Sequence, residues 1–334
     1  MADAWSPDAL AAALADPLAS ERWSVLTGEA VLAIDLREQG RPAPERWARL
    51  GELPAVTVGW AGDEVAEALR PLAAGVDVLI QDQVALAAIE TAVAAHPLAS
   101  LALVQLLRHS EGLGIHEGLI AESLVYGTLQ GGPEFAAWLS AYPRREPPPE
   151  AGDPLRVERE QALLRLTLDR PQRRNAFSAG LRDALCEALA LVQQDPSIEA
   201  VELRGSGPSF CSGGDLDEFG SVPDPATAHA VRSTRNPGRL LAPFAGRVHA
   251  HIHGACVGAG IEIPAFCGRV SAREDAFAML PEVGMGLVPG AGGTVSLPRR
   301  IGRQRTAWMA LTGARIPADQ CLRWGLVDEI EPGG

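Results

Sequence analysis

Two glycine-rich turns in the second half of the chain constrain its fold more than any other feature. They are FCSGGDL at Phe210–Leu216 and HGACVGAGIE at His253–Glu262, and a short strand-like apolar run precedes each of them. Glycine at a turn from strand to helix lets the backbone approach a ligand closely and leaves amide N–H groups pointing outward. Two such turns facing each other can hold one oxygen atom between two amides, which is an oxyanion hole.

Strands and helices alternate around these turns. ALLRLTLD at Ala162–Asp169 predicts a strand, and Ser178 is the expected N-cap of a helix that runs to about Gln194. VELRG at Val201–Gly205 and RVHAHIHG at Arg247–Gly254 predict two further strands. This alternation is typical of parallel βαβ units, so we expect an α/β fold.

The first half of the chain has a different pattern. Short strand-like runs give way to helical periodicity over residues 83–141, and the runs lie at Val31–Leu36, Ala55–Trp60 and Val76–Ile80. The Pro-rich segment 143–154 predicts a linker. We therefore divide the chain into an N-terminal α/β region (1–142), the linker and a second domain (155–334).

The absence of lysine excludes several enzyme classes. All 29 basic residues are arginine, whereas a Walker phosphate loop, a Schiff-base enzyme and the Tyr-x-x-x-Lys pair of short-chain dehydrogenases each need an amine. The run Gly254-x-x-x-Gly258-x-Gly260 also matches a dinucleotide-binding turn. It lies deep in the chain, however, and both tyrosines precede it, which disfavours that interpretation.

Charge and composition limit the partners and the compartment. A formal net charge of −13 argues against nucleic acid or an anionic membrane as a partner. No window of 18 uncharged apolar residues predicts a membrane span, and the acidic N-terminus does not resemble a signal peptide. The five cysteines are scattered without a CxxC pair, so we expect reduced thiols in a cytoplasmic protein.

Five segments in order resemble the signatures of the crotonase, or enoyl-CoA hydratase/isomerase, superfamily. Besides the two glycine turns, LPEVGMGLVPGAGGTVSLPRRIG at Leu280–Gly302 is the most specific of them. The others are LDRPQRRNAFS at Leu168–Ser178 and ALTGARIPADQCLRWGLVDEI at Ala310–Ile330. The resemblance implies a spiral of ββα units with flanking helices, and a coenzyme A thioester as substrate.

The resemblance also implies how such a thioester is held. By motif position, the backbone N–H groups of Gly214 and Ala259 form the oxyanion hole, although most members have glycine at the second position. Asp215 and Leu216 correspond to residues that line the acyl-CoA site. Ala176 corresponds to the residue whose carbonyl meets the adenine.

Two glutamates match the catalytic pair of the family's hydratases. Glu262 follows the second glycine turn, and Glu282 follows Pro281 in the fourth signature. Adding water to an α,β-unsaturated thioester needs a base for the water and an acid for the α-carbon, and burial in an apolar pocket raises a carboxyl pKa toward neutrality. We expect Glu262 to activate water and Glu282 to deliver the proton. Pro264 lies two residues beyond Glu262 and is expected to bend its helix.

His249, His251 and His253 alternate along one predicted strand, so their imidazoles share a face. A metal site is the alternative interpretation, but no Cys, Asp or Glu completes a familiar ligand spacing. We expect no metal and no cofactor beyond the coenzyme A of the substrate.

The order of segments in this chain differs from that of the family. HPLASLALVQLLR and the helical pattern that continues to residue 141 resemble the tail that normally follows the GLVDEI segment, including Glu122. We expect these tail-like helices (83–141) to precede the core and pack on it, and residues 24–81 to be either a degenerate crotonase-like half or an unrelated α/β module.

These observations predict an enoyl-CoA hydratase-like enzyme of fatty acid metabolism, a lyase, that forms a homo-oligomer, with a trimer or hexamer favoured by the resemblance. The alternatives are a double-bond isomerase of the same fold and a non-catalytic crotonase-like scaffold, suggested by Ala259, Pro264 and the segment order.

Overall fold

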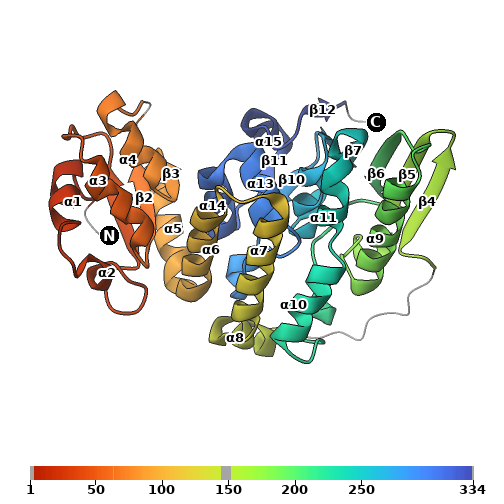
Figure 1. The fold of residues 1–334 in the computed structure, drawn as a ribbon, viewed down its shortest axis with the longest axis horizontal. Coiled ribbons are helices and arrows are strands. Elements are labelled where there is room, and N and C mark those ends of the chain that lie inside the picture. The colour runs from red at the N-terminus through yellow and green to blue at the C-terminus, as the bar shows by residue number, and fades with distance from the viewer. Residues whose placement is uncertain (1–3, 63, 144–151, 333–334) are drawn as a thin grey trace.

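A mixed sheet lies toward the end of the molecule that is farthest from the N-terminal region (Figure 1). The computed structural model describes residues 4–62, 64–143 and 152–332. Within the last of these ranges the sheet has six strands in the order β12-β9-β7-β6-β5-β4, and only β4 runs antiparallel to its neighbour. The strands are β4 (Leu155–Glu160), β5 (Leu163–Leu168), β6 (Ala200–Gly205), β7 (Val248–Ile252), β9 (Arg269–Arg273) and β12 (Glu329–Glu331).

A smaller sheet and a set of helices complete this half. In the described part of the chain the smaller sheet has the order β11-β10-β8, and it carries the second glycine turn at the end of β8. Its strands are β8 (Ala255–Val257), β10 (Phe277–Met279) and β11 (Ile316–Pro317). The helices are α9 (Ala179–Gln194), α10 (Pro225–Thr234), α11 (Pro237–Leu241), α12 (Ala259–Glu262), α13 (Gly293–Ile301), α14 (Arg303–Thr312) and α15 (Ala318–Trp324).

The predicted strands and helix of this half are confirmed with small changes at their ends. The Ser178 side chain accepts a hydrogen bond of 3.2 Å from the Leu181 N–H, so it caps α9 as expected. β5 and β6 pair in parallel across α9, which is the predicted βαβ unit. β4 was not expected, because most residues of its sequence LRVERE are charged and exposed on an edge strand.

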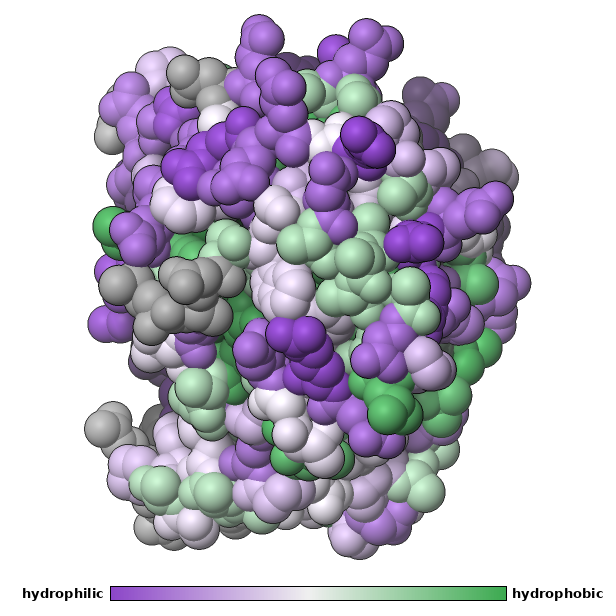
Figure 2. Space-filling model, turned by 90° about the vertical axis from the view of Figure 1, so that its left-hand side faces the viewer, coloured by the Kyte–Doolittle hydropathy of each residue, from purple (hydrophilic) through white to green (hydrophobic). Residues whose placement is uncertain are grey.

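The N-terminal region has its own parallel sheet, β1-β2-β3, in residues 4–82 as described. The predicted strands are confirmed as β1 (Val31–Asp35), β2 (Val56–Trp60) and β3 (Val78–Ile80), and the helices beside them are α1 (Pro7–Ala13), α2 (Ala19–Arg22), α3 (Pro44–Trp47) and α4 (Arg70–Gly75). One face packs on these helices through a separate cluster that includes Trp23 and Leu32. On the outer end of this region, hydrophobic residues form small patches among hydrophilic ones (Figure 2).

Four helices connect the N-terminal sheet to the second half. They are α5 (Gln83–Ala95), α6 (Pro97–Ser110), α7 (Ile115–Gln130) and α8 (Pro133–Ala141). α6 and α7 pack on α13, α7 lies beside α10, and α5 packs on α14 (Figure 1). No single helix in the described ranges is long and apolar enough to cross a membrane. α5 and α6 reach that length and apolar content only when taken together, and the chain bends by 112° between them.

One hydrophobic core runs through both halves. It includes Val58 of β2, Leu103 of α6, Leu203 of β6 and Leu297 of α13, all fully or nearly fully buried. The tail-like helices are therefore part of the same packed body as the glycine turns. All five cysteines are free thiols, as expected. Most of the predicted linker, residues 144–151, lies outside the described residues.

Candidate active site

The two glycine turns lie side by side. The Cys211 N–H donates to the Ala255 carbonyl at 3.2 Å, and the Val257 N–H donates back to the Cys211 carbonyl at 3.0 Å. A Cβ atom at Gly260 would collide with that same carbonyl. Glycine is therefore required where the second turn enters α12, because a side chain would push the turns apart.

Each turn exposes one backbone N–H group. Gly213 (φ +97°) and Gly258 (φ +50°) both adopt left-handed backbone conformations. Each immediately precedes one of the two predicted oxyanion-hole residues, Gly214 and Ala259. Among the described residues, neither the Gly214 N–H nor the Ala259 N–H donates a hydrogen bond. Both amides are thus available to an acceptor supplied by a ligand.

The structure brings the two predicted glutamates together beside Gly258. A Cβ atom at this glycine would lie 2.5 Å from Glu282 Oε1 and 3.7 Å from Glu262 Oε1. Glu262 is the last residue of α12, and Glu282 begins the 3₁₀ turn Glu282–Met285. Both carboxyl groups therefore lie next to the residue that precedes the Ala259 amide.

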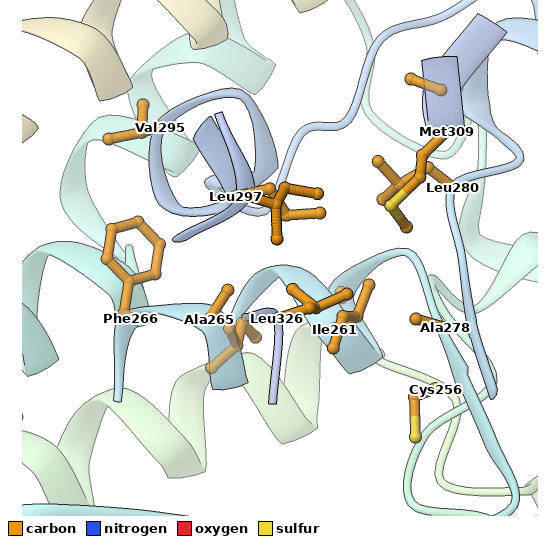
Figure 3. Close-up of a cluster of buried hydrophobic side chains, with 14 of the residues drawn as sticks. Cys256, Ile261, Ala265, Phe266, Ala278, Leu280, Val295, Leu297, Met309 and Leu326 are labelled. Atoms are coloured by element: carbon orange, nitrogen blue, oxygen red, sulfur yellow. The ribbon is translucent and has the colours of Figure 1, made fainter. Parts of the chain in front are cut away.

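α12 is short because it ends just before Pro264, where the sequence predicted a bend in the helix. A 3₁₀ turn over Pro264–Phe266 follows directly. Ile261 and Ala265 point toward Leu297 of α13 in the buried cluster of Figure 3. This packing fixes the orientation of α12 and so the direction in which Glu262 points.

The two carboxyl groups are held differently. Glu262 Oε2 accepts hydrogen bonds of 2.8 Å from both the Ala291 and the Gly293 N–H groups. Glu282 Oε2 is buried and has no hydrogen-bond partner among the described residues. Burial raises the pKa of Glu282 to about 8. Burial and the neighbouring Glu282 carboxyl raise the pKa of Glu262, while the two N–H groups act in the opposite direction.

A third buried glutamate joins this pair from the first half of the chain. Glu122 of α7 is 2% exposed and accepts hydrogen bonds from the N–H groups of Gly292 (2.7 Å) and Thr294 (2.9 Å) and from the Thr294 hydroxyl (2.7 Å). Burial raises its pKa to about 7. From the sequence, Glu122 is only part of the tail-like pattern and has no assigned role. The signal that could have found it is an acidic residue at helical spacing from Leu119, on the buried face of α7.

The predicted acyl-CoA residues lie beside the first turn. Asp215 is buried in ion pairs with Arg170 (3.2 Å) and Arg173 (2.5 Å). The Ala176 carbonyl accepts a hydrogen bond of 2.6 Å from Arg170, and Leu216 begins a 3₁₀ turn. The Asp215 side chain thus braces this loop.

An aromatic cluster lies beside Gly214. The Phe219 ring is so close to Gly214 that a Cβ atom there would lie 2.9 Å from it. Phe135 and Trp138 of α8 pack against this ring at 6.4 and 5.9 Å between centroids. A tail-like helix therefore forms part of the apolar cover over the first glycine turn.

The histidines of β7 share a face, as predicted. The His249 and His251 ring centroids are 3.9 Å apart. His249 contacts the Ser271 hydroxyl, and His251 Nδ1 lies 2.6 Å from a carboxyl oxygen of Glu331 on β12. The third histidine, His253, contacts the Gly207 carbonyl instead. Glu331 could join His249 and His251 as a ligand, and sequence spacing missed it because it lies 80 positions from His251.

Comparisons with known proteins agree with this geometry. A family profile described as enoyl-CoA hydratase/isomerase matches residues 158–333. The 2,3-dehydroadipyl-CoA hydratase of Escherichia coli (strain K12) is 37% identical over 176 residues, which cover 53% of this chain and 68% of that protein. The 1,2-epoxyphenylacetyl-CoA isomerase of the same organism is 33% identical over 175 residues, covering 51% of this chain and 67% of that protein.

A crystal structure of an enoyl-CoA hydratase from Mycobacterium smegmatis superposes with a TM-score of 0.51 at 31% identity, covering 54% of this chain and 70% of that one. The chain belongs to the enoyl-CoA hydratase/isomerase family, and its core has the crotonase fold expected from the signatures. The profile match begins at residue 158, so the tail-like helices lie outside it.

Proposed function

We propose that this protein catalyses the reversible addition of water to a 2-enoyl thioester of coenzyme A. The observation that carries the proposal is the pair of carboxyl groups beside Gly258, with the Ala259 amide next to them and the Gly214 amide on the adjoining turn, neither amide having an acceptor in the described chain. This combination supplies a base, an acid and an oxyanion hole within one site.

In the proposed reaction, the thioester oxygen lies between the Gly214 and Ala259 N–H groups. Attack of water on C3 moves the double-bond electrons toward C2 and the carbonyl, so negative charge develops on this oxygen as an enolate. Preorganised amides bind that charge more strongly than the neutral carbonyl of the substrate, and each such donor contributes about 10²–10³ in rate.

The two glutamates divide the proton transfers. Glu262, oriented by two N–H donors that oppose the rise of its pKa from burial and from Glu282, removes one proton from the attacking water in its carboxylate form. Glu282, with a pKa of about 8, is protonated at neutral pH and delivers its proton to C2. The proton on Glu262 then returns to Glu282, so that water has been added across the double bond. No electron leaves or enters, so the reaction needs no redox cofactor, and we propose no metal.

Coenzyme A binding is assigned to the loop beside the first turn. We assign Leu216, the Asp215 backbone and the Ala176 carbonyl to this contact, as the family resemblance implies. We also propose that α5–α8 take the place of the family's C-terminal tail. The packing of α5, α6 and α7 on α13 and α14 supports this assignment. We further propose a homo-oligomer, a trimer or hexamer, which light scattering on the purified protein would detect.

The test is hydration of crotonyl-CoA. The reaction is monitored by the loss of ultraviolet absorbance of the conjugated thioester, and the product is identified by chromatography. We expect 3-hydroxybutyryl-CoA from the wild-type protein. Binding of the thioester with no change in absorbance would instead support the non-catalytic scaffold.

A second reaction also has an observation in its favour. Glu282 Oε2 is buried without a hydrogen-bond partner in the described ranges, and one such carboxyl group is enough to move a proton between C4 and C2. Migration of the double bond of 3-hexenoyl-CoA, with no hydrated product from either substrate, would support the isomerase.

A further inference from the structure

Four consecutive backbone N–H groups connect Glu122 to Glu262. They belong to residues 291–294 at the start of α13, and they alternate between the two carboxyl groups. The odd-numbered pair donates to Glu262 and the even-numbered pair to Glu122, over distances of 2.7 to 2.9 Å. Neither carboxyl group can turn without breaking the hydrogen bonds of this row.

The local sequence permits this arrangement through two glycines. Gly292 has φ +103°, a conformation that L side chains rarely adopt. A Cβ atom at Gly293 would lie 2.6 Å from Glu262 Cγ. Side chains at these two positions would exclude the close approach of the carboxyl groups to the amides.

We propose that Glu122 is a positioning residue, which holds the Glu262 carboxylate in its reactive orientation through the shared row of amides at residues 291–294. This inference rests on the proposed function of Glu262. It assigns part of the catalytic machinery to α7, a helix that the family profile does not cover.

The charged and titratable groups around this pair are few among the described residues. Glu282 faces Glu262 from its 3₁₀ turn, and Tyr126 lies on α7, one turn from Glu122. Arg232 of α10 stacks on the Tyr126 ring at 4.6 Å. The Cys211 thiol, next to Glu262, has its pKa raised to about 12 by burial and stays neutral. The negative charges of Glu282 and Glu122 therefore both raise the pKa of Glu262, and the positive charge of Arg232 lowers the pKa of Glu122.

Glu122→Gln is the informative substitution, because it keeps the shape and removes the charge. A neutral amide can accept at only one oxygen, so one N–H of the even-numbered pair loses its partner. Removal of a like charge also lowers the pKa of Glu262. This charge effect acts through space, so the effect on kcat compared with that on KM separates positioning from a purely structural role.

The experiment titrates Glu262 by NMR of its ¹³C-labelled carboxyl carbon, assigned with Glu262→Gln, in the wild type and in Glu122→Gln. We expect the Glu262 titration to move down by roughly one pH unit and the control Glu117→Gln, on the exposed side of α7, to leave it in place. An unchanged titration in folded Glu122→Gln would overturn the proposal, whether or not the protein hydrates any thioester.

Turnover gives the second readout. We expect kcat for crotonyl-CoA to fall about 10- to 100-fold in Glu122→Gln with little change in KM, because the base is misdirected rather than lost. Wild-type kcat in this variant would contradict the inference. If Glu122→Gln does not fold, Thr294→Val removes one hydroxyl donor to Glu122 but keeps its charge, so we expect a fall in kcat with little change in KM. Wild-type kcat in that variant would also overturn the proposal.

Discussion

At the scale of single residues, the chemistry depends on two carboxyl groups that share one apolar site but have different partners. Glu262 is fixed by backbone donors, whereas Glu282 Oε2 has no donor in the described chain. Donors favour the ionised form and burial favours the neutral form, and burial raises the pKa of both groups. The proposed roles therefore rest on how the two groups are held: backbone donors orient Glu262, and Glu282 Oε2 has none in the described chain.

Glu282→Gln should abolish hydration while leaving thioester binding largely intact. The amide is close in shape to the protonated carboxyl group but cannot donate an acidic proton to C2, so we expect kcat to fall by about 10²–10⁴. Steady-state kinetics with crotonyl-CoA and calorimetric titration of the thioester measure the two effects separately. Glu274→Gln, on an exposed turn, is the matched control, and equal turnover in both variants would refute the role.

The pH dependence of hydration follows from the Glu282 carboxyl group. Hydration needs protonated Glu282, so we expect kcat to decline as the pH rises through about 8. A rate that stays constant to about pH 10, where the carboxyl group is ionised by this account, would exclude Glu282 as the acid.

Protein stability should depend on pH through Glu282 as well. Its native pKa of about 8 exceeds the ordinary value of 4.5, so its contribution to stability is complete below about pH 4.5 and is lost as the pH rises through about 8. Glu282→Gln removes this loss. We expect the free energy of unfolding of the variant relative to wild type to rise by roughly 2 to 4 kcal/mol between pH 5 and pH 9. Urea denaturation at both values measures it, and no difference would show that burial does not perturb this carboxyl group.

At the scale of elements, the second glycine turn needs a residue at position 258 that adopts a positive φ and has no side chain. Gly258→Ala would force a strained φ of +50° and bring a methyl group 2.5 Å from Glu282 Oε1. We expect a loss of about 1–3 kcal/mol in stability and a fall in kcat of about 100-fold from displaced Glu282. Gly246→Ala, whose added Cβ meets no atom within 4 Å, should do neither. Normal kinetics in Gly258→Ala would mean that the carboxyl group is not where the reaction occurs.

Most of the strands and several of the helices could be predicted from the sequence. The apolar runs located β1, β2, β3, β5, β6 and β7, whereas Pro264 predicted a bend at the place where α12 ends. β4 was not predicted, because this exposed edge strand lacks a clear alternation of hydrophobic and polar residues. Glu122 could not be assigned because 140 positions separate it from Glu262, and only the packing of α7 on α13 brings them to one row of amides.

At the scale of the whole molecule, a buried ionic cluster ties the N-terminal sheet to the helices. Asp77, 1% exposed, pairs with Arg108 of α6 at 2.5 Å and with Arg303 of α14 at 3.3 Å, and it accepts from the Thr57 hydroxyl at 2.8 Å. Three segments far apart in sequence thus meet at one carboxylate.

Asp77→Ala should destabilise the protein by about 3–5 kcal/mol, because it leaves Arg108 without its carboxylate partner and Arg303 with only the exposed Glu111 at 3.3 Å. Thermal or urea unfolding measures the change. Asp319→Ala, which removes an exposed pair with Arg323, should leave stability nearly unchanged. Similar small effects in both variants would mean that the N-terminal sheet is not held by this cluster.

The most direct test of the account is the structure of Glu282→Gln with crotonyl-CoA bound. We predict that the thioester oxygen lies about 3 Å from both the Gly214 and the Ala259 nitrogen atoms, with Glu262 and residue 282 facing the C2–C3 double bond. A thioester oxygen that contacts neither nitrogen, or a double bond out of reach of both side chains, would contradict the account.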